Sequence, residues 1–348
     1  RSKYSGLRIS KEAATILAMR VALYEGSWEK YHKGTKFATE DNHTEFFQEV
    51  MKWGDEQFFK SKLALNTKDT DKEYVNAEDA FAHLFNKKDL SQIQEAVLWK
   101  KYSVADGVFH RLGALLASGA VDGQGPSGLS KSLVDNYLNA DGTFINPKDE
   151  KYKDFNEMFK ERDARLLVTV MHSGPDCKYR ASSPTNKPMN VRAYDATGTE
   201  DEMKEKNEDI VSPNLNGDGN SKSVTGFHIR LGIDTTYVDN ESETVVVLFR
   251  YAEGLLCYAE AAEELDLCTD DVLNKTLKPL RERAGVTYVK PTKADPNFPF
   301  TGLSPVLQEI RRERRSELAL QGFRLDDLMR WAVAGTLKGQ DGRGRGAY

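Results

Sequence analysis

The stretch that decides the fold is IRRERRSELALQGFRLDDLMRW, residues 310–331. Its first part places four arginines and two glutamates within residues 311–317, and an apolar LAL follows. Such a run can form a basic surface for nucleic acid, a solvated helix face, or a helix that is buried in the protein. Acidic residues interrupt the basic run, which argues against nucleic-acid binding. The spacing of the apolar residues bears on the other two possibilities.

Helical periodicity favours the buried helix. Ser304 can cap a helix, and Pro305 suits its first position. At about 100° per residue, Arg314 and Glu317 fall in the middle of an apolar face and Glu313 lies at its edge. The apolar residues that share this face are Val306, Leu307, Ile310 and Leu318.

Charged side chains on an apolar face need partners, because a buried unpaired charge is costly. Within the helix, the pairs Glu309–Arg312 and Arg314–Glu317 are spaced i, i+3 and can partly neutralise each other. A wholly solvated charged helix remains the alternative. If the helix is buried, we expect its acids to find further partners on neighbouring helices, with the candidates Arg250, Arg281 and Arg283.

A glycine turn follows the charged helix. Gly322 predicts a helix end that needs positive φ. Asp326 and Asp327 then favour the start of a second short helix, which Gly335 would stop. Helix, glycine turn and helix in succession are typical of helical repeats.

Three further segments show helical spacing, namely residues 9–31, 45–59 and 245–267. Ser10 is the expected N-cap of the first, and the second could be its antiparallel partner. Small residues at the expected crossings resemble tetratricopeptide pairs, although the full repeat signature is absent. The residues expected to share a face are, in order, Ala14, Leu17, Ala18, Val21 and Tyr24; Phe46, Phe47, Val50 and Met51; and Leu248, Ala252, Leu255, Leu256, Ala259 and Glu263.

The composition changes between residues 66 and 243, where Gly, Pro, Asn and Ser become frequent. Short strands are expected at 96–103, 165–171 and 226–233, although the first could be the end of a helix. The sequence thus predicts a helical scaffold that holds a loop-rich lobe. A rigid scaffold with variable loops is a common way to build a binding site.

Composition excludes several classes of protein. The chain has 348 residues and a net charge of −5, which does not suit non-specific binding to phosphate. No apolar run reaches the length of a membrane-spanning helix. Cys177, Cys257 and Cys268 form no disulfide framework and no zinc motif. Cys257 lies in a helical pattern and is expected to be a small core residue.

Catalytic motifs are absent from the sequence, which has no GxSxG, no P-loop, no HExxH and no Rossmann glycine fingerprint. This favours a binding protein over an enzyme, and no cofactor is expected. The run NLNGDGN places Asn214, Asn216 and Asp218 as in the first half of a calcium loop. Thr225 at the twelfth position supplies no carboxylate, so a polar turn is the favoured interpretation.

The segments RYAEGLLCYAEAAEEL, LNKTLKPLRERAGV and EIRRERRSELALQGFRLDDLMRW together closely resemble the C-terminal half of the SusD/RagB family. Earlier segments at 8–28, 97–103, 125–142 and 159–170 agree, in family order, so the resemblance runs from about residue 7 to 331. It implies a mainly α fold in which tetratricopeptide-like helix pairs pack against an irregular, loop-rich lobe with short strands. The expected parts of this single SusD-like unit are a helical repeat-like segment at 7–65, a variable lobe at 66–243 and a C-terminal helical segment at 244–335.

The resemblance also implies a function. Family members are outer-membrane, cell-surface lipoproteins of Bacteroidetes-type bacteria that bind glycans without catalysis and cover a SusC-like TonB-dependent transporter. Some relatives handle peptides. A peptide-binding uptake lipoprotein, an unrecognised glycan-active enzyme, and a scaffold that binds only its transporter therefore remain alternatives. Nucleic acid is not an expected partner.

Two sets of residues carry the site predictions. Residues matching the family's recurrent pattern are expected to form a structural ion-pair network, namely Glu313, Arg314, Glu317, Arg324 and Asp327. Sugar sites combine aromatic faces with hydrogen-bonding Arg, Asn and Asp side chains. On that basis the loop 172–195 supplies the expected glycan-binding residues Tyr179, Arg180, Arg192 and Tyr194.

The chain departs from the family pattern in three places. Family chains usually start well before the segment at 8–28, so the lipidated cysteine and earlier helices are expected to precede Arg1. The usual C-terminal tail would follow Tyr348. Pro279 is expected to kink or restart its helix.

Overall fold

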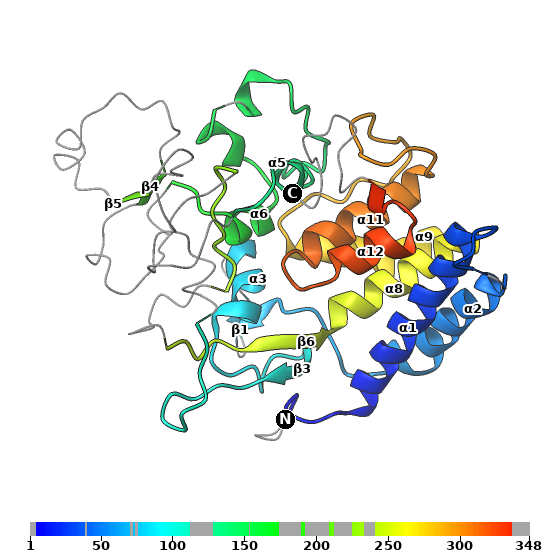
Figure 1. Ribbon diagram of the computed structural model, residues 1–348. Coiled ribbons are helices and arrows are strands. Elements are labelled where there is room, and N and C mark those ends of the chain that lie inside the picture. The colour runs from blue at the N-terminus through cyan, green and yellow to red at the C-terminus, as the bar shows by residue number, and fades with distance from the viewer. Residues whose placement is uncertain are drawn as a thin grey trace.

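The computed structural model describes residues 5–38, 40–69, 72–73, 76–111, 128–152, 154–173, 189–191, 209–211, 225–232 and 241–335 (Figure 1). The α-helices in this part are α1 Lys11–His32, α2 His43–Trp53, α3 Ala77–Asn86, α5 Lys131–Val134, α6 Ala164–Thr169, α8 Tyr251–Glu264, α9 Asp270–Lys275, α10 Leu277–Arg283, α11 Pro305–Glu317 and α12 Arg324–Arg330. A π-helical turn, η1 Gly54–Phe58, continues α2, and the 3-10 turns are η2 Glu150–Tyr152 and η3 Glu157–Phe159.

The strands are short and form two-stranded sheets. The pair β3 Ala96–Lys100 and β6 Val246–Arg250 is antiparallel, as is the pair β1 Lys68–Asp69 and β2 Lys72–Glu73. The strands β4 Met189–Val191 and β5 Asp209–Val211 run parallel. In the part of the chain that the structure describes, no helix is both long enough and apolar enough to cross a membrane.

Helices α1 and α2 fold back on each other and pack against α8 (Figure 1). The Ser10 side chain accepts a hydrogen bond from the backbone N–H of Ala13 at 3.2 Å, so the predicted start of α1 is confirmed. Phe47 and Val50 are buried between the helices, as predicted. The predicted partner helix for residues 9–31 is therefore correct.

The prediction of which face of α1 lies inward was wrong. Leu17 is 46% exposed and Val21 is 58% exposed, whereas Ile16, Met19 and Leu23 are buried. Apolar side chains occur around most of α1, so periodicity alone did not distinguish the faces. The packing of α2 and α8 determines which face of α1 is buried. It leaves an apolar strip of α1, which includes Leu17 and Val21, uncovered in the described structure.

A close helix crossing joins α8 to the end of α2. A Cβ at Gly54 would lie 2.2 Å from Cδ2 of Tyr258, and a Cβ at Gly254 would lie 2.2 Å from Cε2 of Phe58. Each glycine therefore makes room for an aromatic ring of the other helix. The π-helical turn holds Phe58 in this position.

Segment 245–250 differs from the helical prediction, because β6 pairs with β3 and the helix begins only at Tyr251. Leu248 consequently lies on a strand and is 48% exposed. β3 confirms the predicted strand at 96–103.

The predicted strand at 165–171 was wrong, because α6 occupies Ala164–Thr169. The Asp163 side chain accepts from the backbone N–H of Arg165 at 2.9 Å and caps this helix. Within this segment only Val170 forms a bridge, to Ile229. A local cap thus overrode the β-branched residues that favoured a strand. The strand predicted at 226–233 was also wrong, because the described residues 226–232 contain the isolated bridge at Ile229 and no strand.

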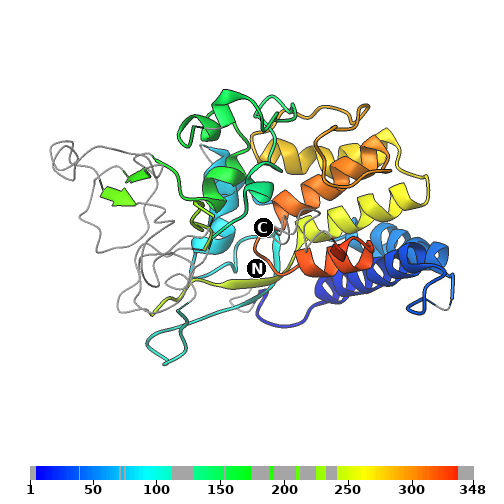
Figure 2. The ribbon, with the colours of Figure 1, turned by 45° about the horizontal axis from the view of Figure 1, so that its top comes forward.

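Helix α11 lies at the centre of the C-terminal helices, between α8, α10 and α6 (Figures 1 and 2). Ser304 caps it through the backbone N–H of Leu307 at 3.0 Å, which confirms its predicted start. Residues 307–314 are all buried. The alternative of a wholly solvated charged helix is wrong.

The C-terminal helices confirm the expected breaks at Gly322 and Pro279, but the predicted stop of the last helix at Gly335 was wrong, because α12 already ends at Arg330. Gly322 has φ +89° in the turn between α11 and α12, with Asp326 and Asp327 in the first turn of α12. Thr276 separates α9 from α10, and Pro279 lies in the first turn of α10, so the helix restarts near Pro279 as predicted. Proline is tolerated there because that turn needs no donor.

Candidate functional site

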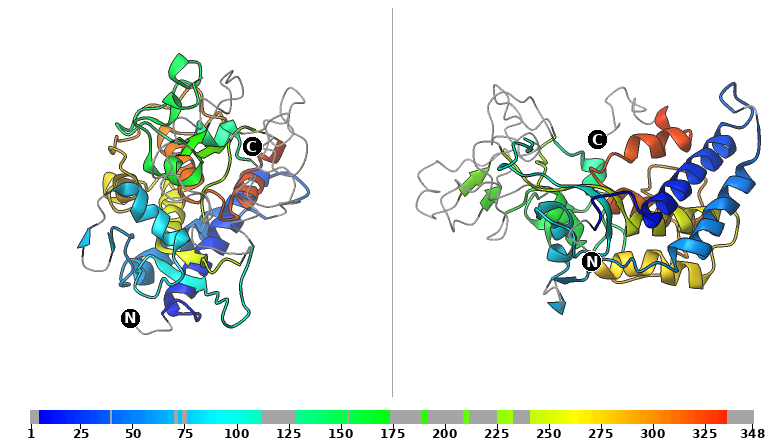
Figure 3. Two further views of the ribbon diagram at one scale, coloured as in Figure 1. Left: turned by 90° about the vertical axis from the view of Figure 1, so that its left-hand side faces the viewer. Right: turned by 90° about the horizontal axis from the view of Figure 1, so that it is seen from below.

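A cavity of about 530 Å³ opens between α1, β6 and the turn that leads into α12. Figures 2 and 3 show α12 lying beside α1. Apolar residues make most of the wall, among them Val21, Leu23, Val246, Leu248, Leu320 and Phe323. The uncovered strip of α1 therefore continues into the cavity.

Arg20 is a firmly held but partly exposed polar group in the wall. Its Nε and Nη2 donate to the two carboxylate oxygens of Glu253, with Nη2 at 2.7 Å, and Nη2 also donates to the carbonyl of Leu248 at 3.2 Å. The guanidinium carbon lies 4.2 Å from the ring centroid of Phe249 and 4.9 Å from that of Phe323. In the described structure Nη1 has no acceptor, and the side chain keeps 31% of its surface exposed.

Tyr24 and Asp326 lie on the side of the cavity formed by α1 and α12. Burial raises the pKa of Tyr24, and the negative charge of Asp326 raises it further, against the opposing charge of Arg330. The Tyr24 ring stacks on Trp28 with centroids 5.9 Å apart. The cavity thus offers a fixed donor, a phenol and an exposed carboxylate.

The floor of the cavity is part of a larger network of buried ion pairs. Nε of Arg314 donates to both carboxylate oxygens of Asp327, at 2.8 and 2.9 Å. Arg330 pairs with Glu260 at 2.6 Å and with Asp327 at 3.0 Å. All four side chains are buried, and Arg314, Asp327 and Arg330 face the cavity.

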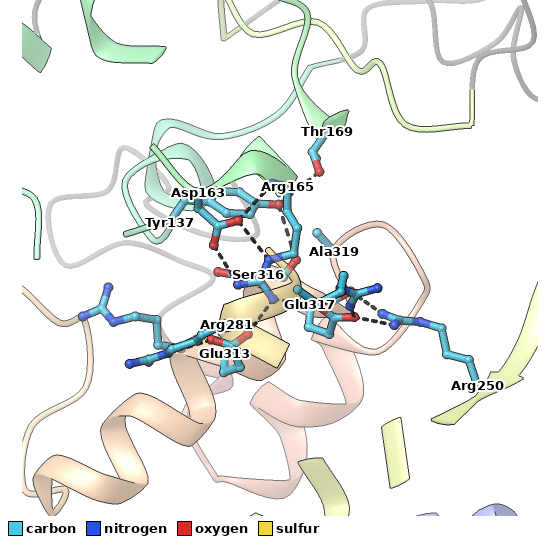
Figure 4. A network of polar contacts seen from close by, with 12 residues as sticks. Tyr137, Asp163, Arg165, Thr169, Arg250, Arg281, Glu313, Ser316, Glu317 and Ala319 are labelled. Atoms are coloured by element: carbon cyan, nitrogen blue, oxygen red, sulfur yellow. Dashed lines mark hydrogen bonds and ion pairs between the residues drawn. The ribbon is translucent and has the colours of Figure 1, made fainter. Parts of the chain in front are cut away.

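One turn further along α11, Glu317 is the centre of the network (Figure 4). It is fully buried and accepts from Arg165 at 2.6 Å, and it also accepts from Arg250 and Arg283. Burial alone would raise the pKa of Glu317, but the three guanidinium groups hold it far below its usual value. Glu95 joins the cluster by pairing with Arg250 at 2.8 Å.

Helix α11 carries two more acids of this network. Glu313 accepts from Arg165 at 2.5 Å and from Arg281 at 3.1 Å. Glu309 accepts from Arg281 at 2.6 Å and from Arg312 at 2.8 Å. The i, i+3 pair between Glu309 and Arg312 is therefore confirmed, and so are the three predicted partners Arg250, Arg281 and Arg283.

Two predicted contacts differ from the structure. Arg314 pairs with Asp327 rather than with Glu317, whose oxygens are already occupied by other guanidinium groups. Arg324 lies over the rings of Phe300 and Trp331, with centroid distances of 5.5 and 5.9 Å. Among the described residues it has no ion pair within 4 Å. Burial lowers the pKa of Arg324 to about 10 although Asp327 opposes this shift.

The residues predicted to bind glycan, Tyr179, Arg180, Arg192 and Tyr194, lie outside the described residues. The weak calcium candidates, Asn214, Asn216 and Asp218, lie outside them too. Within the described ranges, no group of three or more His, Cys, Asp or Glu side chains is placed to hold a metal ion.

Sequence reasoning missed the cavity. Its polar residues come from distant segments, with Arg20 and Tyr24 on α1 and Asp326 on α12. The one available signal was Arg20, a single arginine within the apolar pattern of residues 9–31. It could have indicated a buried carboxylate partner, but it could not indicate a cavity.

The fold and site define a mainly helical protein whose helices frame a cavity with apolar and polar walls. A family model described as the SusD family matches residues 86–348. The chain belongs to the SusD family, so the predicted family and mainly α SusD-like fold are confirmed. No curated protein matches the chain.

Solved structures of SusD-like proteins share this fold. A SusD-like carbohydrate-binding protein from Bacteroides fragilis is 21% identical, with a TM-score of 0.59 over 97% of this chain and 55% of that one. A second SusD-like protein from Bacteroides fragilis is 18% identical, with a TM-score of 0.59 over 96% of this chain and 56% of that one. A structure described as containing a xylogluco-oligosaccharide is 17% identical, with a TM-score of 0.56 over 94% and 52% of the two chains. The chain thus spans little more than half the length of these proteins.

Proposed function

We propose that this protein binds oligosaccharides or polysaccharides at the cell surface without cleaving them, for uptake through a SusC-like TonB-dependent transporter. The observation that carries the proposal is membership of the SusD family over residues 86–348. Two of the similar structures are described as a carbohydrate-binding protein and as a structure with a xylogluco-oligosaccharide.

The buried ion pairs of the chain suit a binding protein, because they fix the helices that carry the loops. Buried ion pairs tie α11 to α6, α10, α12 and β6, so the helices form a rigid frame for the surrounding loops. A rigid frame keeps binding groups in position and lowers the entropy lost when a ligand is bound. Attachment to the outer membrane by a lipid anchor outside these 348 residues belongs to the same proposal.

The test is a glycan-array screen of the purified protein, with a peptide array screened beside it. Binding to one class of glycan and to no peptide is the expected result. Binding to peptides alone would replace the proposed ligand by the peptide class, and binding to neither would contradict the proposal. Tyr194→Ala should weaken glycan binding if the loop 172–195 contributes to the site.

A further inference from the structure

The size of the cavity suits a small polar ligand. Its volume of about 530 Å³ lies within the range of about 300–1,000 Å³ that is usual for small-molecule sites. Val21, Leu248 and Phe323 line it with apolar surface. A pyranose ring has an apolar face of C–H groups that can pack on such surface, so a sugar residue fits both the size and the wall.

Arg20 is arranged to donate hydrogen bonds to a ligand. Glu253 fixes Nε and Nη2, and the rings of Phe249 and Phe323 hold the guanidinium plane. Nη1 carries two N–H donors that no acceptor in the described structure uses. A donor whose rotamer is already locked loses little entropy on binding.

The charges around the cavity favour a neutral ligand. Glu253 neutralises Arg20, and Asp327 lies between Arg314 and Arg330. Among the described wall residues, an anionic ligand would find no uncompensated cation, and a cationic ligand would find only the exposed carboxylate of Asp326. Hydroxyl groups suit the cavity better, because a hydroxyl group can either accept from Arg20 or donate to Asp326.

We propose that this cavity is a subsite for one residue of a neutral oligosaccharide, with Arg20 donating to its hydroxyl groups and Asp326 accepting from them. Tyr24 contributes its hydroxyl and the edge of its ring on the α1 side. The inference rests on the proposed carbohydrate binding and adds a location and a ligand class to it. The subsite lies apart from the loop 172–195 in sequence and uses only described residues.

The test is isothermal titration of the wild type and of cavity variants with xylogluco-, malto- and cello-oligosaccharides. Asp326→Asn removes the charged acceptor, and Val21→Trp fills the mouth of the cavity from an exposed position of α1. Matched controls are Asp271→Asn, in the first turn of α9, and Leu267→Trp, at another exposed apolar position. Arg20→Lys keeps the charge opposite Glu253 but loses the planar donor.

We expect Asp326→Asn to weaken binding by about 10-fold or more, the effect of losing a hydrogen bond to a charged group. Val21→Trp should weaken it at least as much, and both controls should bind as the wild type does. Wild-type binding that both cavity variants retain would overturn the subsite but keep the proposed function. A wild type that binds no glycan in titration or on the array would overturn both. A thermal melt of each variant shows whether lost binding reflects unfolding.

Discussion

Glu317→Gln is the substitution that most directly tests the role of the buried ion pairs. Glutamine keeps the shape of glutamate and one acceptor oxygen, so the change removes charge without opening a cavity. Glu317 is fully buried and serves Arg165, Arg250 and Arg283 together. Its loss leaves Arg250 and Arg283 to share the single carboxylate of Glu95.

The magnitude follows from the cost of a broken buried pair, about 3–5 kcal/mol of unfolding free energy. The unfolding entropy is about 2.1 cal/mol/K per residue, or about 0.7 kcal/mol/K for a cooperative unit of 348 residues. The melting temperature should therefore fall by about 4–7 °C.

Differential scanning calorimetry at neutral pH measures this shift. Glu157→Gln is the matched control, because Glu157 pairs with Lys160 at 2.5 Å on the surface and half of its side chain is exposed. The control should change the melting temperature by less than about 1 °C, since exposed pairs contribute little. A melting temperature within about 1 °C of the wild type for Glu317→Gln would refute the reasoning.

Three further predictions follow from the packing and the charges. Gly254→Ala should lower the unfolding free energy by about 1–3 kcal/mol in a denaturant titration, because its Cβ would lie 2.2 Å from the Phe58 ring. Gly335→Ala meets no atom of the described residues within 4 Å and should be neutral. Burial alone would raise the pKa of Glu260, but Arg330 and its hydrogen bonds lower it to about 2. Glu260 therefore adds about 3 kcal/mol of stability above pH 4.5 that is lost progressively toward pH 2. Melts across this range should show a loss smaller by about this amount in an otherwise folded Glu260→Gln, in which Glu317 still titrates. Burial raises the pKa of Cys257 to about 12, against the opposing charge of Arg314. Mass spectrometry should therefore find this thiol unmodified by iodoacetamide at pH 8 until the protein unfolds. Modification of Cys257 in the native protein would contradict its burial.

The charged helix α11 could be predicted because its signals are local. Ser304 and Pro305 mark its start, and periodicity places Glu317 on the apolar face. The need for compensating cations then pointed to Arg250 and Arg283, because a buried carboxylate must be paired. The electrostatic argument therefore predicted contacts between residues that are more than thirty positions apart in the sequence.

The buried face of α1, helix α6 and the cavity could not be predicted, because they depend on packing or capping that periodicity does not encode. α1 is apolar around most of its surface, so only the positions of α2 and α8 show that Leu17 and Val21 stay uncovered. The segment beginning at Arg165 has the β-branched residues of a strand, yet the cap at Asp163 makes it a helix. The cavity brings Arg20 into one wall with residues three hundred positions away, which no local pattern could indicate.

Affinity electrophoresis combined with a reducing-end assay tests the central claim, non-catalytic binding of a glycan, most directly. Native gels containing xyloglucan, starch or mixed-linkage β-glucan are run beside a gel without polysaccharide, with serum albumin as the non-binding reference. The account predicts that one polysaccharide retards the protein while the same mixture releases no new reducing ends over a day. Retardation with a rise in reducing ends would show an enzyme instead. Unchanged migration in every gel, together with no signal on the glycan array, would contradict glycan binding.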